Sequence, residues 1–141
     1  QARAVTMRTG RQIAALYEEH NLDLHLSATL AYPPSRVGEL EIGNAERIAL
    51  AALRRAATGR VLRMVLDQLA ADSLAKSPNT QLFNMTGQPA MSVPLVWNAA
   101  GLPIGVQFAG RFGDEVTLLR LATQLEAARP WFDRLPPLVA E

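Results

Sequence analysis

The side chains of this chain that could do chemistry are mainly hydroxyls and carboxylates, because the sequence holds no cysteine, one lysine and two histidines. A serine nucleophile usually sits on a tight, glycine-flanked turn with a base within reach. No such setting surrounds the serines considered for this role: Ser27, Ser35, Ser73, Ser77 and Ser92. Lys76 stands before a proline-punctuated segment, where a surface lysine is favoured over the base of a Ser–Lys pair. We therefore assign no catalytic residue to this chain.

Metal and phosphate chemistry are not encoded by local patterns either. Without cysteine there is no Cys-type zinc site, and two isolated histidines do not make a metal centre unaided. The glycines in and after the apolar runs suit turns and close packing better than a phosphate loop: Gly101, Gly105, Gly110 and Gly113. His25 lies on the polar side of an alternating segment, which favours an exposed or sheet-covering histidine over a catalytic base. We expect no metal and no cofactor.

Polar and conformationally special residues gather at one place, Asn84 to Pro89, between two apolar segments. We predict that Asn84 to Pro89 is a loop at the edge of a sheet, reached from a break at residues 77–79 through residues 80–83, and that any functional surface lies there. Side chains in such a loop often bond the backbone. For Asn84, Thr86, Gly87 and Gln88 this structural role is favoured over contact with a ligand.

The elements that must position this loop follow from hydrophobic periodicity. Two apolar runs, at about residues 91–97 and 103–109, flank the turn formers at residues 98–101 and predict a β-hairpin. Pro94 places the first of these strands at an edge, since proline donates no ladder hydrogen bond. A broad apolar stripe predicts a helix over about residues 114–128, capped by Asp114.

The upstream half reads as helix, strand and two further helices. An amphipathic helix is predicted over residues 2–20, softened at Thr9-Gly10 and ended by Asn21 in the left-handed conformation. Residues 22–30 alternate with period two, as in a half-buried strand with its leucines inside. Helices over about 45–57, capped by Asn44, and 61–75 follow. The fold class is α/β, with residues 1–141 as a single segment.

Composition limits the partners of the chain. A hydrophobic fraction of 49% in 141 residues is enough for a core, and a net charge of +1 does not favour nucleic acid. The arginines at 54, 55, 60 and 63 are read as solvated helix faces, with anion binding as the alternative. No run approaches the roughly 20 residues that span a bilayer, so we expect a cytoplasmic protein without a membrane partner. The chain begins at Gln1 inside a helical pattern, and we expect a fragment or a processed chain.

Several submotifs together resemble the C-terminal part of amidase signature enzymes. They occur in the family's order and spacing: FNMTGQPAMSVP at residues 83–94, GLPIGVQ at 101–107, GDE at 113–115, LLR at 118–120 and EAARPW at 126–131. Residues 23–34 are similar to the strand-then-PP segment of the same enzymes. Ala28 stands where the family usually has a proline before the threonine, Thr29 in this chain.

The resemblance implies a serine hydrolase that acts on linear carboxylic amides through a Ser–Ser–Lys triad. The triad and its Gly/Ser-rich segment belong to the family's N-terminal portion and match nothing here, so the isolated chain is expected to be inactive. The implied fold is the C-terminal part of the amidase signature fold, a mixed β-sheet flanked by helices, and not an independent catalytic domain. The implied role is scaffold and part of the substrate cleft. Within it, the substrate-binding candidates are Ser77, Asn79, Thr80 and Phe83, with Thr29 as a weaker one.

The resemblance leaves two readings of the partners. In the first, the rest of an amidase chain, or a second subunit carrying the triad, completes an enzyme for a small-molecule amide. In the second, the chain is a non-catalytic subunit or scaffold of an amidase or amidotransferase-like assembly. A sheet cut from its neighbours would expose apolar surface of several hundred Å², by order of magnitude, so we expect the isolated chain to aggregate or to form homo-oligomers.

Overall fold

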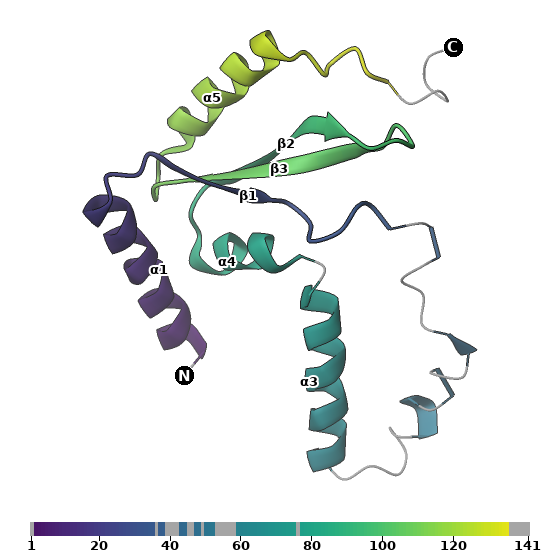
Figure 1. Cartoon of the computed structure of the whole chain (residues 1–141). Helices are drawn as coiled ribbons and strands as arrows, with labels where there is room; N and C mark the ends of the chain where they lie inside the picture. Colours follow the sequence, from purple (N-terminus) through teal and green to yellow (C-terminus); the bar gives the residue numbers. More distant parts are fainter. Residues whose placement is uncertain are drawn as a thin grey trace.

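The computed structural model describes residues 2–35, 37–38, 43–44, 47–48, 50–52, 59–75 and 77–135. Its elements are α1 (Ala2–Glu19), β1 (Leu24–Ala28), α3 (Gly59–Ala75), α4 (Pro78–Thr86), β2 (Ala90–Trp97), β3 (Pro103–Gly110) and α5 (Glu115–Ala128). The described strands form one sheet in the order β1-β3-β2, and both neighbouring pairs are antiparallel. Helix α5 lies on one face of this sheet and α4 on the other (Figure 1). The predicted α/β class is confirmed.

The hairpin formed by β2 and β3 is confirmed and is slightly longer than predicted. Asn98 closes its turn, because the side-chain Oδ1 accepts the backbone N–H groups of Ala100 at 3.0 Å and Leu102 at 2.9 Å. Gly101 adopts φ 77°, a conformation that favours glycine. Among the described strands β2 pairs with β3 only, and its register shifts between Pro94 and Val96, so the edge position predicted from Pro94 is confirmed.

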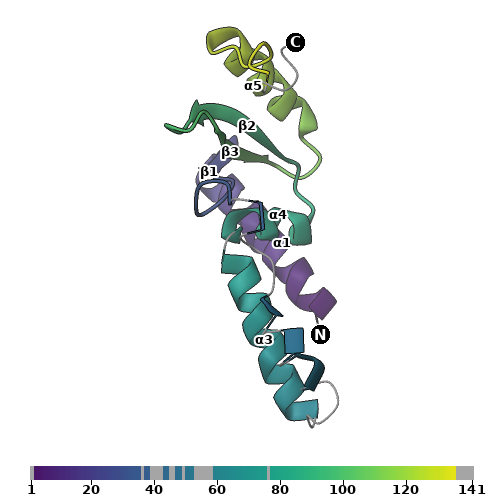
Figure 2. The ribbon, with the colours of Figure 1, turned by 90° about the vertical axis from the view of Figure 1, so that its right-hand side faces the viewer.

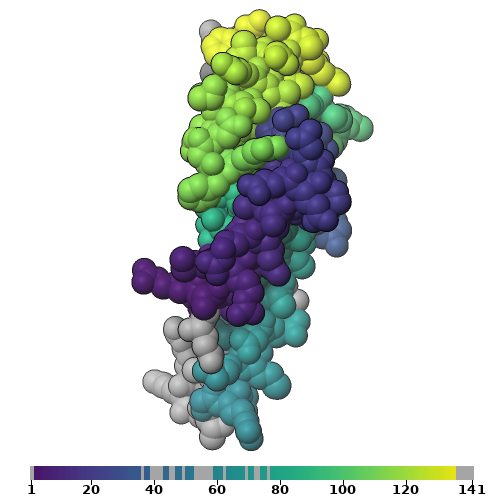
Figure 3. Space-filling model, turned by 90° about the vertical axis from the view of Figure 1, so that its left-hand side faces the viewer, coloured from purple at the N-terminus to yellow at the C-terminus, as the bar shows by residue number. Residues whose placement is uncertain are grey.

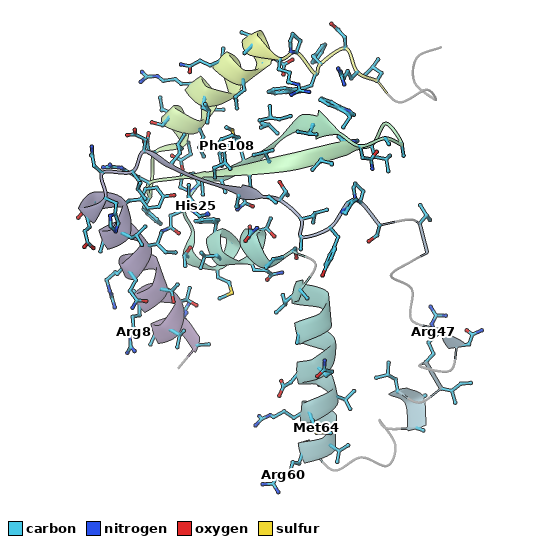
Figure 4. All side chains as sticks on the ribbon, in the orientation of Figure 1. Arg8, His25, Arg47, Arg60, Met64 and Phe108 are labelled. Carbon is cyan, nitrogen blue, oxygen red and sulfur yellow. The ribbon has the colours of Figure 1, made fainter. Side chains whose placement is uncertain are left out.

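The apolar core lies between the hairpin and α5. Val93, Phe108 and Leu118 are buried there, and partly buried side chains pack around them: Leu24, Met91, Leu95, Val106, Leu121, Leu125 and Trp131. Figure 4 shows Phe108 on the α5 side of the sheet. The predicted cap of α5 is also confirmed, because the Asp114 carboxylate accepts the Thr117 backbone N–H at 3.3 Å and its hydroxyl at 2.7 Å.

Helix α1 runs without interruption, so the softening predicted at Thr9-Gly10 is wrong. The Thr9 hydroxyl donates to the Val5 carbonyl one turn earlier in the same helix. Gly10 lies against α4, since a Cβ placed on it would be 3.7 Å from the Thr86 Cβ. The glycine thus serves a close helix contact, which outweighs its low helix propensity. Asn21 follows the helix with φ 49°, and the predicted left-handed stop is confirmed.

Strand β1 is shorter than the predicted segment, and one of its leucines is not inside. Leu26 shares a face with its register partner Phe108 but is 64% exposed. Helix α5 packs on β2 and β3, whereas β1 lies beyond it at the rim of the sheet. The alternation indicated the correct face, but a pattern with period two contains no information on whether that face is covered.

The largest correction concerns the stretch before the hairpin, where a break at residues 77–79 and a loop at residues 84–89 were predicted. Residues 78–86 instead form α4, with Pro78 in the first turn and Gly87 at the C-terminal end, and only residues 87–89 remain as a loop. Gly87 has φ 82°, and its N–H donates to the Phe83 carbonyl at 2.9 Å. Proline and glycine bound this helix at the two positions where each is favoured, so the same residues that suggested a loop are its boundary signals.

Helix α3 extends away from the sheet, beyond α4 (Figure 2). It covers the predicted helix over 61–75, and the predicted break at Ser77 separates it from α4. Arg60 and Arg63 are exposed on it, as a solvated face requires. Much of the predicted helix over 45–57, together with Arg54, Arg55 and Lys76, lies outside the described residues. Within the described part, no helix combines the length and apolar character needed to cross a membrane.

Candidate functional site

The face of the sheet that α4 covers is polar. Ser27 on β1, Gln107 on β3 and Ser92 on β2 are register partners, so their side chains form one row across this face. His25 projects on the same side, opposite to Phe108 (Figure 4). The Oγ of Ser27 is buried and has no hydrogen-bond partner among the described residues. One face of the sheet therefore builds the apolar core, and the other presents hydroxyl and amide groups to α4.

Two amide side chains attach the start of α4 to this face. Asn79 donates from Nδ2 to the Ala28 carbonyl at 2.9 Å, and Gln107 donates from Nε2 to the Asn79 carbonyl at 3.3 Å. Gln107 is only 3% exposed, so its hydrogen bond to α4 is shielded from water. These two contacts link α4 to β1 and β3, and they fix where the helix begins relative to the sheet.

A pair of hydroxyls lies next to this attachment. The Thr29 Oγ1 and Ser92 Oγ atoms are 2.6 Å apart, and either can be the donor. They meet above Gly105, where an added Cβ would lie 2.5 Å from Ser92 Oγ and 2.7 Å from Thr29 Oγ1. One hydroxyl hydrogen is used within the pair, so the second hydrogen and the remaining lone pairs are available to a ligand. Ser92 is exposed and Thr29 is half-buried, which keeps the pair accessible.

The first turn of α4 contributes Ser77 and Thr80. The Thr80 hydroxyl donates to the Ser77 carbonyl at 3.2 Å, and the Ser77 hydroxyl accepts a long contact of 3.5 Å from the Gln81 amide. Ser77 precedes the helix without capping it through its side chain. Backbone N–H groups at a helix start carry partial positive charge and attract oxygen acceptors.

Phe83 is placed differently from the other candidates. It is 4% exposed and packs against His25, with ring centroids 5.5 Å apart. In this chain its side chain therefore fills the space between α4 and β1.

The structure thus brings four of the predicted site residues, Thr29, Ser77, Asn79 and Thr80, to one corner formed by the start of α4 and the end of β1, and it places Phe83 further along α4 against His25. Three residues of this corner were not predicted, namely Ser92, Gly105 and Gln107. A signal for two of them was present, because Ser92 and Gln107 are the polar positions in otherwise apolar strands. Their pairing with Ser27 depends on the strand register, which spacing within one strand does not contain.

The chemistry of this corner is hydrogen bonding. Apart from His25, the side chains named here are neutral hydroxyl, amide and aromatic groups. In the described part of the chain, no three residues of the His, Cys, Asp or Glu type are grouped so as to hold a metal ion. The corner can therefore hold a polar group of a ligand, but it contains no paired acid and base.

Two further grooves, of about 290 and 240 Å³, lie along α1 and share Ala14, Gln88 and Phe112. None of the predicted site residues lines either groove. Gln88 is 7% exposed, and its side-chain oxygen accepts the Thr86 hydroxyl. Thr86 also contacts the Leu82 carbonyl at 2.8 Å. These bonds agree with the structural role expected for Thr86 and Gln88.

Comparison with known proteins gives a family match and several relatives. The family model described as Amidase matches residues 1–119. A protein of Mycobacterium tuberculosis that is named as an amidase, AmiB2, is 34% identical over 134 residues, which is 95% of this chain and 24% of that protein. The 6-aminohexanoate-cyclic-dimer hydrolase of a Pseudomonas species is 45% identical over 71 residues, covering 50% of this chain and 14% of that enzyme.

A solved structure agrees with these matches. The 6-aminohexanoate cyclic dimer hydrolase, determined in complex with substrate, superposes with a TM-score of 0.64 at 30% sequence identity. The superposition covers 92% of this chain and 25% of the hydrolase chain. The chain therefore spans about a quarter of the length of these relatives.

Proposed function

This chain belongs to the amidase family, and from that premise we propose that it is part of an amidase, an enzyme that hydrolyses the C–N bond of a carboxylic amide. The match over 134 residues to a protein four times as long is the observation that carries this proposal. The proposed reaction is that of a serine hydrolase, with linear amides as the substrate class. A cyclic amide is added as a test substrate, because one relative is named for such a substrate.

The proposed Ser–Ser–Lys triad lies outside this chain. Lys76 is the single lysine of the sequence, and no Gly/Ser-rich segment accompanies it. The hydroxyl pair of Thr29 and Ser92 has no lysine or carboxylate among its hydrogen-bond partners. A hydroxyl without such a base remains protonated and is a weak nucleophile.

The proposed contribution of this chain is one wall of the substrate cleft, at the corner of α4 and β1. Thr29 supplies a hydroxyl that is already close to a second one, and Ser77 and Thr80 stand at the start of a helix, where an oxygen acceptor is favoured. The Asn79 amide is bonded to the Ala28 carbonyl and the Phe83 ring is buried, so these two residues would shape the wall more than touch the substrate. The wall would orient the amide, and residues outside this chain would attack it.

The experiment that tests this division of labour is an assay of the purified 141-residue chain. The substrates are hexanamide, as a linear amide, and the 6-aminohexanoate cyclic dimer, with chromatographic detection of the acid product. We expect no hydrolysis, while the cyclic-dimer hydrolase of Paenarthrobacter ureafaciens, 49% identical over 57 residues, serves as the active control. Hydrolysis by the isolated chain that disappears in Ser77→Ala or Ser92→Ala would place the nucleophile in this chain and refute the proposal.

The second candidate is a non-catalytic subunit of an amidase or amidotransferase-like assembly. This second candidate is favoured by the coverage, because the chain matches only about a quarter of AmiB2 and of the solved hydrolase, and a second polypeptide could supply the remainder. Purification of the chain from its native source under mild conditions separates the two. A stoichiometric, different polypeptide that carries the triad supports the subunit, whereas recovery of the sequence within one longer polypeptide supports the single-chain enzyme.

A further inference from the structure

Two hydroxyl groups from strands that are not neighbours meet over β3. The Thr29 Oγ1 and Ser92 Oγ atoms are 2.6 Å apart. Thr29 follows β1 and Ser92 lies on β2, and Gly105 of the intervening strand leaves the space between them free of a side chain. The Thr29 N–H also donates to the Gly105 carbonyl at 3.1 Å, so the sheet holds the backbone that carries this hydroxyl. The pair is therefore a fixed feature of the sheet surface.

The hydroxyl pair is accessible in the described part of the chain. Ser92 is exposed and Thr29 is half-buried. Helix α1 lies over the other end of the sheet, where the Tyr17 hydroxyl donates to the Ala109 carbonyl. Figure 3 shows this end, with α1 in purple at the surface and the dark blue start of β1 behind it in the chain. Because Thr29 follows the last residue of β1, α1 does not cover the pair.

The pair offers one donor beside several acceptor positions. Each hydroxyl has one hydrogen and two lone pairs. One hydrogen joins the two oxygens, so the second hydrogen is directed to a ligand, next to free lone pairs on the oxygen that donates within the pair. Since either hydroxyl can be that donor, both orders of donor and acceptor are available. A ligand that satisfies both oxygens must carry an acceptor and a donor side by side.

An amide with an N–H on the same side as its carbonyl oxygen has this arrangement. Its bond lengths place the amide N and O atoms about 2.3 Å apart. The two hydroxyl oxygens are separated by 2.6 Å, so both hydrogen bonds can form at ordinary lengths. A primary amide always has such an N–H, and a small lactam ring fixes one. In other secondary amides the N–H points away from the carbonyl oxygen, because the trans form is strongly preferred.

We propose that Thr29 and Ser92 form a subsite that binds the amide group of a primary amide or a small lactam, and that it discriminates against trans secondary amides. This inference rests on the proposed function, because it assigns a substrate class and a second residue, Ser92, to the cleft wall. A further strand of a longer protein fits the pair less well. Its peptide groups are trans, so each of them can satisfy only one of the two hydroxyls. The geometry thus favours a small amide over a backbone segment as the occupant.

Three ligands of similar size test the discrimination on the unmodified chain. Hexanamide is a primary amide, caprolactam is a cis secondary amide held in a ring, and N-methylhexanamide is a trans secondary amide. NMR titration of the isotope-labelled 141-residue chain with millimolar ligand gives the dissociation constants. We expect hexanamide and caprolactam to bind about fivefold more tightly than N-methylhexanamide, the effect of one hydrogen bond. Caprolactam also carries a carbon substituent on nitrogen, so it separates loss of the hydrogen bond from steric exclusion.

Two variants, Ser92→Ala and Thr29→Val, each remove one hydroxyl of the pair. Each should lose the preference for hexanamide over N-methylhexanamide, because a single hydroxyl bonds either ligand equally well. The preference is a ratio of two dissociation constants, so a change in the folded fraction cancels from it. The matched control is Thr123→Val, which should keep the preference. The Thr123 hydroxyl donates to the Leu119 carbonyl within α5, on the other face of the sheet (Figure 1).

The proposal is overturned if hexanamide does not bind, or if N-methylhexanamide binds the unmodified chain as tightly as hexanamide does. It is also overturned if Ser92→Ala and Thr29→Val keep the preference, which would make the pair a purely structural link between β1 and β2. These measurements record binding, whereas the assay of the purified chain records hydrolysis. A failure of the subsite is therefore distinguishable from a failure of the proposed function.

Discussion

At the scale of single residues, Gly105 is the position where the absence of a side chain leaves room for a pair of hydroxyl groups. Thr29 and Ser92 come from different strands, and their hydroxyls meet in the space that a side chain at 105 would occupy. Its φ is not in the left-handed region, so conformational freedom is not what requires glycine here. The requirement is steric, and it arises from two strands that are far apart in the sequence.

Replacement of this glycine should be costly. Gly105→Ala is expected to destabilise the chain by about 1–3 kcal/mol, because the new methyl group would overlap both hydroxyls. Gly59→Ala is the matched control, since a Cβ on Gly59 meets nothing within 4 Å and alanine favours the helix. Urea unfolding followed by circular dichroism compares the two. Equal midpoints for both variants would show that the hydroxyl pair moves aside at no cost.

Tyr17 is a buried residue of α1 that connects this helix to the sheet through a hydrogen bond. It is 3% exposed, and its hydroxyl donates to the Ala109 carbonyl at 2.8 Å. Burial, opposed in part by a hydrogen bond from the His25 backbone, raises the pKa of Tyr17 above its usual value. The folded chain therefore holds this proton more tightly than the unfolded chain does.

The raised pKa leads to a pH dependence of known sign. The stabilisation is fully present below about pH 10, the pKa of an unfolded tyrosine, and it is lost as the pH rises from there through the higher pKa of the folded state. Tyr17→Phe should lower the free energy of unfolding by about 1 kcal/mol at neutral pH, and should flatten its decline above about pH 10. Tyr32→Phe is the control, because Tyr32 is 66% exposed. An unchanged alkaline slope in Tyr17→Phe would contradict the assignment to Tyr17.

At the scale of elements, the segment after α5 fastens the helix to the hairpin. The Glu126 carboxylate accepts the backbone N–H groups of Trp131 at 3.0 Å and Phe132 at 3.1 Å. Trp131 packs against the core, and the Arg134 guanidinium lies 4.1 Å from the centroid of the Trp97 ring. The segment thus turns back over the sheet at the far end of the hairpin.

Both tryptophans of the chain, Trp97 and Trp131, take part in these contacts. Intrinsic fluorescence therefore reports directly on whether the segment after α5 is packed against the hairpin. Glu126→Ala should release the segment, shift the emission to longer wavelength and lower stability by about 1.5–3 kcal/mol, the range for hydrogen bonds to a charged group. Gln124→Ala, at an exposed position of the same helix, should leave both unchanged. If Glu126→Ala keeps the emission of the unmodified chain, the carboxylate does not hold the segment.

Among the elements, those with strong local signals were predicted well. The hairpin, α5 and the end of α1 each have their own turn or cap residue: Asn98, Asp114 and Asn21. Helix α4 was missed because its polar residues and its flanking proline and glycine also occur in loops. What makes it a helix on this sheet is tertiary, since Asn79 and Gln107 bind across 28 residues of sequence.

At the scale of the whole molecule, the chain is a helix–sheet–helix arrangement with one polar and one apolar sheet face. Its relatives are about four times as long, and the matched part of the solved hydrolase is a quarter of that chain. The proposed cleft wall lies on the polar face of the sheet, which the apolar core does not use. This wall is consistent with a portion of a larger fold, and the assay of the purified chain tests it.

Local sequence was sufficient to establish the family, the hairpin with its following helix, and the absence of a recognisable nucleophile setting. These properties depend on motifs and periodicities that are complete within about ten to fifteen neighbouring residues. Only the folded structure decided that residues 78–86 form a helix, that Leu26 is exposed and that Thr29 meets Ser92. Each of these depends on strand register and on which layer covers which face, and such long-range contacts leave no local pattern from which they could be predicted.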